Sequence, residues 1–231
     1  ARAETGLLRH LIYLAEACYL RDELEVSGVE HLHAHFGTNA TMVAMLCHSL
    51  GGPAYSFTTH GPEEFDSPRA LSLGTKIHHA AFAVAISQFG RSQLCRWADP
   101  ADWPRIKVVH CGIEPAKFPT PAPLPDGERR LVSIGRFVEQ KGQIALIEAM
   151  GQLRDSHPDL HLTLIGDGEL RRAIEAEIAH HGLADRVTLT GWVDEARITS
   201  ELAAAHALVL PSFAEGLPMV VMEAMAAARP V

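Results

Sequence analysis

Strand-like and helix-like segments alternate along nearly the whole chain, and this alternation restricts the fold more than any other feature. Short apolar runs typical of buried strands are followed by longer segments with apolar residues at helical spacing. The expected strands are residues 30–36, 54–59, 82–86, 106–110, 130–134, 160–165, 186–190 and 206–210. The expected helices are residues 6–24, 39–50, 68–80, 87–97, 142–156, 168–181, 194–205 and a last one that begins at Pro218. Such alternation predicts parallel sheets with helices on both faces.

A proline-rich stretch divides the chain. Residues 114–129 contain five prolines, at positions 115, 119, 121, 123 and 125, which is typical of a semi-rigid linker. We therefore expect a first domain over residues 1–118, a linker over 119–129 and a second domain over 130–231. Each would be a Rossmann-like α/β domain, and ligands of such domains bind at the carboxyl ends of the strands.

The two ends of the chain have the pattern of interior segments. The chain starts without methionine, directly in a helical pattern, and it ends at Pro230 and Val231, an apolar pair that indicates a further strand. The expectation is an internal fragment of a longer enzyme, with both domains incomplete.

Composition excludes several classes of protein. The 231 residues carry a formal net charge of −8, which argues against general nucleic-acid binding because that relies on Lys and Arg. The four cysteines are widely spaced and form no C-x-x-C pair, so neither a zinc site nor a disulfide framework is indicated. The apolar stretch of residues 7–20 is interrupted by charge and too short to span a bilayer. A reducing cytosol is the simplest setting.

The carboxyl-terminal stretch has the layout of an anion site. An apolar strand over residues 206–210 leads through Glu215, Gly216 and Leu217 to Pro218, which suits the first position of a helix. The free N–H groups and the dipole of a helix start attract anions. Glu215 and Glu223, with seven residues between them, do not bind phosphate, but carboxylates accept strong hydrogen bonds from sugar hydroxyls.

Two cations follow the first strand of the second domain. The segment from Gly135 to Gly142 contains Arg136 and Lys141 and lies between a strand and a helix, beside the expected end of the 206–210 strand. A diphosphate gains negative charge as it leaves a sugar, so these cations would stabilise the transition state more than the ground state. We expect them to bind phosphate.

Two further turns follow strands of the second domain. Gly166 lies in a strand-to-helix turn, where glycine allows close packing and where the residue could also line a nucleotide cleft. Trp192 and Val193 end the next strand. The Trp192 ring could stack on a base or pack against the protein, and packing is the favoured interpretation.

Histidines are concentrated in the first domain. His60 ends a strand, where it could donate to sugar hydroxyls and stabilise developing positive charge. His31, His33 and His35 alternate along one strand and share a face, but such histidines close a metal's coordination sphere poorly. We expect neither a metal nor another cofactor.

Several of these segments together resemble the retaining nucleotide-sugar glycosyltransferases of family four, which have the GT-B fold of two facing Rossmann-like domains. The segment EGLPMVVME, from Glu215 to Glu223, is similar to the family's E-x7-E motif, and GRFVEQKG to its GR-x4-KG motif. The GDGEL turn after residue 165 also has a counterpart. The stretch HGPEEFD, residues 60–66, is similar to the exopolysaccharide (colanic-acid-like) branch. The motifs occur in the family's order.

The resemblance implies a role for each motif. It assigns the catalytic roles to His60, Glu215, Arg136 and Lys141, and donor binding to Gly135, Arg136, Lys141, Gly166, Trp192, Val193, Gly216, Leu217 and Glu223. Glu223 would bind the ribose, Glu215 the transferred sugar, and Glu63 or Glu64 the acceptor. One departure is Cys111, where many relatives have Asn, so any polar role at that position is in doubt.

The implied reaction moves a sugar from a nucleotide-diphosphate donor to a glycan or lipid-linked acceptor in exopolysaccharide synthesis, without a metal. The implied location is the cytoplasm, with peripheral attachment to the inner face of the membrane left open. Two alternatives stay open: a nucleotide-sugar epimerase of the same fold, and a non-catalytic module that binds a nucleotide or glycan.

Overall fold

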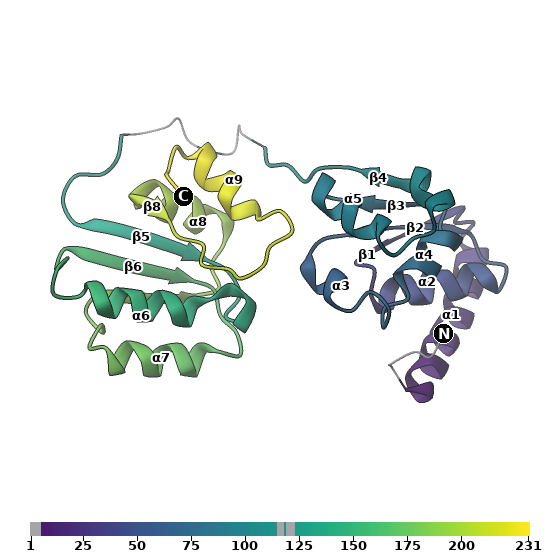
Figure 1. Cartoon of the computed structure of the whole chain (residues 1–231), viewed down its shortest axis with the longest axis horizontal. Coiled ribbons are helices and arrows are strands. Elements are labelled where there is room, and N and C mark those ends of the chain that lie inside the picture. The colour runs from purple at the N-terminus through teal and green to yellow at the C-terminus, as the bar shows by residue number, and fades with distance from the viewer. Residues whose placement is uncertain (1–5, 115–117, 119–122) are drawn as a thin grey trace. The chain divides into compact units, whose positions relative to one another are not determined.

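The computed structural model describes the whole chain except residues 1–5, 115–117 and 119–122 (Figure 1). It divides into two compact units, Ala1–Cys111 and Gly112–Val231, which we call unit 1 and unit 2. Part of the expected linker, residues 119–122, lies outside the described residues. The exact boundaries of 1–118, 119–129 and 130–231 therefore stay a prediction.

Unit 1 contains a four-stranded parallel sheet in the order β1-β2-β3-β4. Its strands are β1 (His31–His35), β2 (Ala54–Thr59), β3 (Phe82–Ala85) and β4 (Ile106–Val108). Its helices are α1 (Leu7–Val26), α2 (Asn39–Ser49), α3 (Pro62–Asp66), α4 (Leu73–His79), α5 (Gln88–Cys95) and the 3-10 helix η1 (Pro100–Arg105).

The helices α2, α4 and α5 cover the same face of this sheet. Their residues Ala44, Ile77 and Leu94 form one core with Tyr55 and Phe57 of β2. An unbroken strand order explains this, because right-handed crossovers that all step in one direction place every helix on one side. The expectation of helices on both faces is thus not met by these three helices of unit 1.

Unit 2 contains a second parallel sheet, in the order β7-β6-β5-β8. Its strands are β5 (Arg129–Ile134), β6 (Leu160–Ile165), β7 (Val187–Gly191) and β8 (Ala207–Leu208). Its helices are the 3-10 helix η3 (Glu139–Lys141), α6 (Gln143–Leu153), α7 (Arg171–His180), α8 (Glu195–Ala204) and α9 (Met219–Ala226).

Here the strand order reverses, and helices lie on both faces as expected. One core joins the sheet to α6 and α7 through residues such as Ile147 and Ile174. A second core joins the other face to α8 and α9 through Leu202 and Ala224 (Figure 1). The change of direction between β7 and β8 moves the crossover to the opposite face.

Most expected elements form within a few residues of their expected bounds, with two corrections. The helix expected over residues 68–80 is wrong in its first half, because α4 begins at Leu73 after Ser72, which has a left-handed backbone (φ 54°). A short helix, α3, begins instead at Pro62. In addition, the last strand is shorter than the expected 206–210, since β8 ends at Leu208.

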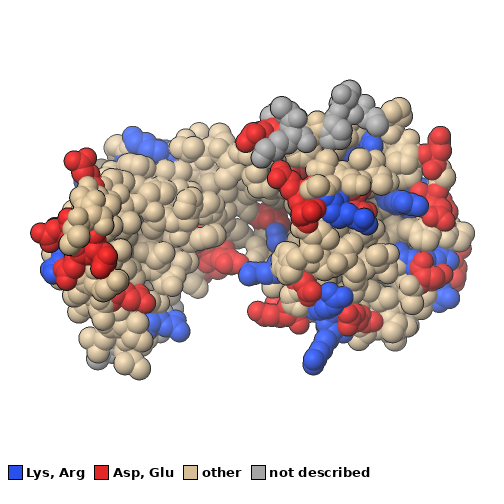
Figure 2. All heavy atoms as spheres, turned by 180° about the vertical axis from the view of Figure 1, so that it is seen from behind, with Lys and Arg blue, Asp and Glu red and all other residues tan. Residues whose placement is uncertain are grey.

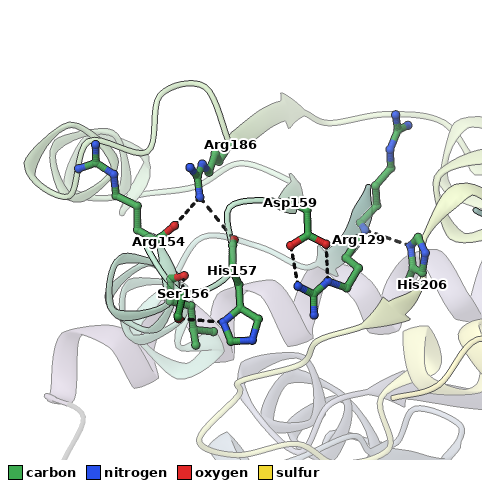
Figure 3. Close-up of polar contacts among 9 residues, drawn as sticks. Arg129, Arg154, Ser156, His157, Asp159, Arg186 and His206 are labelled. Atoms are coloured by element: carbon green, nitrogen blue, oxygen red, sulfur yellow. Dashed lines mark hydrogen bonds and ion pairs between the residues drawn. The ribbon is translucent and has the colours of Figure 1, made fainter. Parts of the chain in front are cut away.

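The amino-terminal edge of the unit 2 sheet is held by polar contacts (Figure 3). Arg129 binds both oxygens of Asp159 at 2.7 and 2.6 Å, which holds the pKa of that carboxyl well below its usual range, at about 2. Arg186 donates to the carbonyl of Arg154 at 2.7 Å, and the Arg130 amide donates to the His206 ring at 3.1 Å. These contacts secure the edge opposite to the one that carries the sequence motifs.

The surface of unit 2 carries charges of both signs. Lys, Arg, Asp and Glu are interspersed over the face of unit 2 that Figure 2 shows. Within the described part of the chain, no helix is both long and apolar enough to cross a membrane.

Arg229 joins the end of α9 to the end of α8. Its side chain is buried, and it donates to the carbonyls of Leu202 and Ala203 at 3.1 and 2.8 Å. These carbonyls belong to the last turn of α8, whose acceptors have no partner inside the helix. Arg229 therefore fixes α9 against α8.

We expect Arg229→Ala to lower the free energy of unfolding by about 2 kcal/mol, because the Ala203 carbonyl loses the Arg229 donor and the Leu202 carbonyl keeps only the Ala205 amide. Urea denaturation measures the change. Arg172→Ala, on the exposed face of α7, is the control and should change the unfolding free energy by less than about 0.5 kcal/mol. Equal effects of the two substitutions would contradict the role given to Arg229.

Lys76 of α4 is buried, with 1% of its surface exposed. Burial lowers the pKa of its amine from 10.5 to about 8, although the nearby Glu64 carboxylate acts in the opposite direction. Between these pH values the unfolded chain holds a proton that the folded chain has released. Stability contributed by this site must therefore rise with pH across that interval.

We expect the unfolding free energy of the wild type, minus that of Lys76→Met, to rise by on the order of 3 kcal/mol between pH 8 and 10.5. Urea titrations at several pH values measure this difference. Burial raises the pKa values of Cys47 and Tyr55, so these two groups make the unfolding free energy fall as pH rises. Both proteins contain them, and taking the difference between the two unfolding free energies cancels their contribution. A difference that stays flat or falls with pH would contradict the prediction.

Candidate functional site

The sequence motifs of unit 2 gather where the strand order of its sheet reverses. The chain runs from β5 outward to β6 and β7 and then returns to place β8 on the other side of β5. In open α/β sheets, ligands bind at the carboxyl ends of the strands beside such a reversal, because the two adjacent loops diverge there. The loops after β5 and β8 carry Arg136, Lys141 and Glu215.

Backbone hydrogen bonds join the loops that follow β5, β6 and β7. The amide of Gly135 donates to the Ile165 carbonyl at 2.9 Å, and that of Gly166 donates to the Gly191 carbonyl at 3.0 Å. Between them, the Phe137 amide donates to the Asp167 carbonyl at 2.9 Å. The Phe137 ring is buried at the same point and anchors the first loop in the core. These hydrogen bonds thus connect the carboxyl ends of β5, β6 and β7 to one another.

Close backbone approach explains two glycines of the motifs. A Cβ atom on Gly142, which has φ 67°, would lie 2.3 Å from the Pro211 carbonyl oxygen. A Cβ atom on Gly166, at φ 136°, would lie 2.1 Å from the Gly135 carbonyl oxygen. The first contact brings the loop after β8 against the start of α6, and the second supports a packing role for Gly166.

Lys141 and Glu215 form an ion pair between these two loops. The Lys141 ammonium lies 2.6 Å from Glu215 Oε1, and about a quarter of each side chain is exposed. Gln140 strengthens the connection, since its side chain donates to the Ala214 carbonyl at 2.8 Å and its own carbonyl accepts from the Phe213 amide at 2.9 Å. Sequence reasoning did not foresee the ion pair, and it missed Gln140, although this residue lies inside the GRFVEQKG motif.

Arg136 is an exposed cation at this edge. Among the residues that the structure describes, its guanidinium has no hydrogen-bond or ion-pair partner, while its carbonyl accepts from the Gln143 side chain at 3.1 Å. An exposed guanidinium fixed through its own backbone can bind an anion without breaking another contact.

The helix α9 begins one residue later than expected. Pro218 is its N-cap, with an extended backbone, and Met219 is its first residue. Glu223 lies within α9, where burial, assisted by the negative charge of Glu195, raises its pKa. Gly216 and Leu217 are half-buried in the loop that leads to the helix.

Trp192 and Val193 lie in the loop after β7 with opposite surroundings. Val193 packs against the core that joins the sheet to α8 and α9. The Trp192 side chain is 68% exposed, so the favoured interpretation, that it packs against the protein, is wrong. An exposed indole at the carboxyl edge of the sheet offers a flat apolar surface to a ligand.

His60 of unit 1 follows β2 and contacts two neighbours. Its Nε2 lies 2.9 Å from His35 Nδ1, and its ring centroid lies 4.7 Å from that of Phe36. Burial, together with His35 and His33, lowers the pKa of His60, which favours the neutral ring. A neutral imidazole can donate one hydrogen bond and accept another.

Glu64 and His33 of unit 1 are both bound by neighbouring protein groups. Glu64, a candidate for the acceptor, is buried with 1% of its surface exposed and binds backbone amides, so the contact with an acceptor is wrong for this residue. His33 is bound to Ser56 and Thr58 at 2.7 and 2.9 Å. In the described part of the chain, no group of three or more His, Cys, Asp or Glu side chains could hold a metal.

Gly142→Ala should lower the free energy of unfolding by about 2 kcal/mol or more, because a left-handed backbone and the Pro211 carbonyl both oppose a side chain there. Thermal or urea denaturation measures the change. Gly112→Ala is the matched control, since a Cβ atom at Gly112 would have nothing within 4 Å. If Gly142→Ala were as stable as the control, the close approach of the two loops would not hold in solution.

Parts of the chain are similar in sequence to known proteins. Residues 116–231 match the family described as glycosyl transferases group 1. The amylovoran biosynthesis glycosyltransferase AmsK of Erwinia amylovora is 34% identical over 157 residues, which cover 64% of this chain and 38% of that protein. The lipopolysaccharide core biosynthesis glycosyltransferase LpsE of Rhizobium meliloti (strain 1021) is 39% identical over 119 residues, which cover 52% of this chain and 32% of that protein. The chain thus spans about a third of the length of these two relatives.

Solved structures of low sequence identity share the fold. Sucrose-phosphate synthase from Thermosynechococcus elongatus superposes with a TM-score of 0.82 at 22% identity, over 100% of this chain and 64% of that one. Anabaena HepE in complex with UDP gives a TM-score of 0.75 at 20% identity, over 93% of this chain and 62% of that one. The expected α/β fold of two Rossmann-like halves with parallel sheets is confirmed. The family match covers half of the sequence and includes every motif of unit 2, and the chain therefore belongs to the group 1 glycosyl transferases.

Proposed function

We propose that this chain forms the donor-binding and part of the acceptor-side structure of a retaining glycosyltransferase. The enzyme moves a sugar from a nucleotide-diphosphate donor to a glycan or lipid-linked acceptor in the synthesis of cell-surface polysaccharide. The observation that carries the proposal is the convergence of Arg136, Lys141, Glu215 and the start of α9 at the strand reversal of unit 2.

The proposed phosphate site combines side-chain cations with a helix start. Arg136 is exposed and binds one phosphate directly, and the first amides of α9 face the same edge of the sheet. Lys141 is paired with Glu215. A diphosphate competes with Glu215 for Lys141, because a doubly charged group attracts the ammonium more strongly than one carboxylate does.

This competition gives Glu215 its own role. Once Lys141 turns to the diphosphate, the Glu215 carboxylate is free to accept hydrogen bonds from hydroxyls of the transferred sugar. Negative charge that develops on the leaving diphosphate then meets a cation already in place, which stabilises the transition state. The ion pair therefore keeps both groups in position before the donor arrives.

The remaining residues bind the ends of the donor. Glu223 of α9 accepts from the ribose hydroxyls, and Gly166, Val193 and the exposed Trp192 border the base. Gly135, Gly216 and Leu217 supply backbone close to the phosphates. His60, as a neutral ring, donates to a hydroxyl of the transferred sugar. No metal takes part in the proposed mechanism, because the cations and the helix start balance the phosphate charge.

Two features of the relatives support transfer rather than epimerisation. AmsK is described as a glycosyltransferase of amylovoran biosynthesis and LpsE as one of lipopolysaccharide core biosynthesis, and HepE was solved with UDP and with UDP-glucose. For this protein, the proposal includes a location in the cytoplasm, where a lipid-linked acceptor would bring it to the inner face of the membrane by peripheral attachment.

Nucleotide binding tests the donor site directly. UDP, GDP or ADP at a hundredfold excess over its Kd should raise the unfolding free energy by about 2.7 kcal/mol in a thermal-shift assay of the full-length protein. Lys141→Met should weaken that nucleotide by about tenfold or more, because it removes a charge-assisted contact. Lys107→Met, at an exposed position of β4, is the matched control and should bind as the wild type does.

The outcome separates the candidate functions. No shift with any of the nucleotides would refute the donor site. A shift without catalysis would identify a binding module, and an epimer released in the absence of acceptor would identify an epimerase. Transfer to an added glycan with an unchanged anomeric configuration, detected by NMR, is the expected result.

A further inference from the structure

Two buried charged residues of unit 1 take no part in the proposed donor site. Glu64 of α3 and Lys76 of α4 are each 1% exposed, although charged side chains are rarely buried without specific partners. Glu64 binds the loops that follow β1 and β2 at the carboxyl edge of the sheet, and Lys76 binds the loop that follows β1. Phe36 and His60 lie in these loops, and His35 is the last residue of β1.

Glu64 binds both loops at once. One carboxylate oxygen accepts from the amide of Gly37, after β1. The other accepts from the amides of His60 and Gly61, after β2, at 2.5 and 3.2 Å. A single carboxylate thus holds the backbone of two neighbouring strand ends in one arrangement.

Lys76 completes the arrangement from the other side of Gly37. Its ammonium donates to the carbonyls of Gly37 and Thr38 at 2.8 and 2.7 Å. The amide of Gly37 is therefore held by Glu64 and its carbonyl by Lys76. A side chain at Gly37 would not fit, because its Cβ would lie 2.7 Å from Leu73 and 3.0 Å from Glu64.

The loop held in this way is strained. Phe36 has a left-handed backbone, with φ 68°, which a bulky residue rarely adopts unless its surroundings impose it. Its 48% exposed ring is aimed at His60, with ring centroids 4.7 Å apart. His60 also contacts His35, whose Nδ1 lies 2.9 Å from His60 Nε2. The backbone that Glu64 and Lys76 bind thus includes that of His60 and, at Gly37, directly follows His35 and Phe36.

Stability alone does not account for two buried charges. Well-packed apolar residues usually replace a buried ionic network without loss of stability. Strain and buried charge that coincide beside one candidate catalytic side chain instead indicate preorganisation of that side chain.

We propose that Glu64 and Lys76 are positioning residues, which act through the backbone of Gly37 and His60 to hold the His60 imidazole in the orientation that the transferred sugar requires. This inference rests on the proposed function, since it assumes that His60 serves the sugar. It extends that function to two residues that touch no substrate.

A double-mutant cycle tests whether Glu64 acts through His60. Glu64→Gln keeps the shape of the side chain, but its amide group must face at least one of the backbone N–H groups that the carboxylate accepts. We expect it to lower kcat by about tenfold to a hundredfold, as a misplaced catalytic group does, with the donor KM changed less than about twofold. In a His60→Ala background the same substitution should have almost no further effect on kcat.

Asp66→Asn is the matched control, because Asp66 is an exposed carboxylate on the same helix. It should leave kcat and KM unchanged. Lys76→Met should show the same loss of kcat as Glu64→Gln and the same absence of effect without His60. An effect of Glu64→Gln that is equally large in both backgrounds would overturn the proposal, because the carboxylate would then support only the fold.

NMR gives a readout that needs no activity. In the wild type, the amides of Gly37, His60 and Gly61 should exchange with solvent more slowly than other loop amides, because they are bound to a buried carboxylate. In Glu64→Gln or the shorter Glu64→Asp, they should exchange faster, and the His60 ring signals should shift. Fast exchange in the wild type would overturn the proposal even if every variant failed to fold.

The two proposals can fail separately. If the wild type transfers no sugar, or if His60→Ala transfers sugar normally, the role of His60 in the proposed function is wrong. The NMR result still decides whether Glu64 and Lys76 fix its ring. If transfer depends on His60 but the cycle shows no coupling, only the positioning role is wrong.

Discussion

The reversal of strand order in unit 2 is the constraint on which its candidate site depends. Parallel strands require crossovers of one hand, so the direction of each step decides which face the next helix covers. The steps from β5 to β7 place α6 and α7 on one face, and the return to β8 places α8 on the other. The loops after β5 and β8 consequently lead to helices on opposite faces of the sheet, and Arg136, Lys141 and Glu215 lie in these two loops.

Close packing sets the spacing of these charged groups. Because Gly142 lets the Pro211 carbonyl approach, Lys141 and Glu215 come within 2.6 Å of each other from opposite sides of the reversal. The opposite edge of the sheet is held by contacts such as those of Arg129 with Asp159. One edge is therefore held by the ion pair of Arg129 with Asp159, and the other carries the ion pair of Lys141 with Glu215.

In unit 1, two buried charged side chains bind the backbone at the carboxyl edge of the sheet. Its strand order has no reversal, so α2, α4 and α5 lie on one face of its sheet. The buried residues Glu64 and Lys76 bind the backbone at the ends of β1 and β2. The rings of His35, Phe36 and His60 contact one another beside this backbone. In both units charged side chains hold the carboxyl edge of the sheet. In unit 2 they bind each other, and in unit 1 they bind backbone groups.

The sequence by itself determined the alternation of strands and helices, the parallel sheets and the motifs at the strand ends, because hydrophobic period and glycine position act locally. Only the tertiary structure decided the strand order, the contact of Lys141 with Glu215 and the exposure of Trp192. It also decided that Glu64, adjacent to the exposed Glu63, is buried and binds the amides of Gly37, His60 and Gly61 in two loops. These outcomes depend on segments far apart in the chain, whose packing no local pattern encodes.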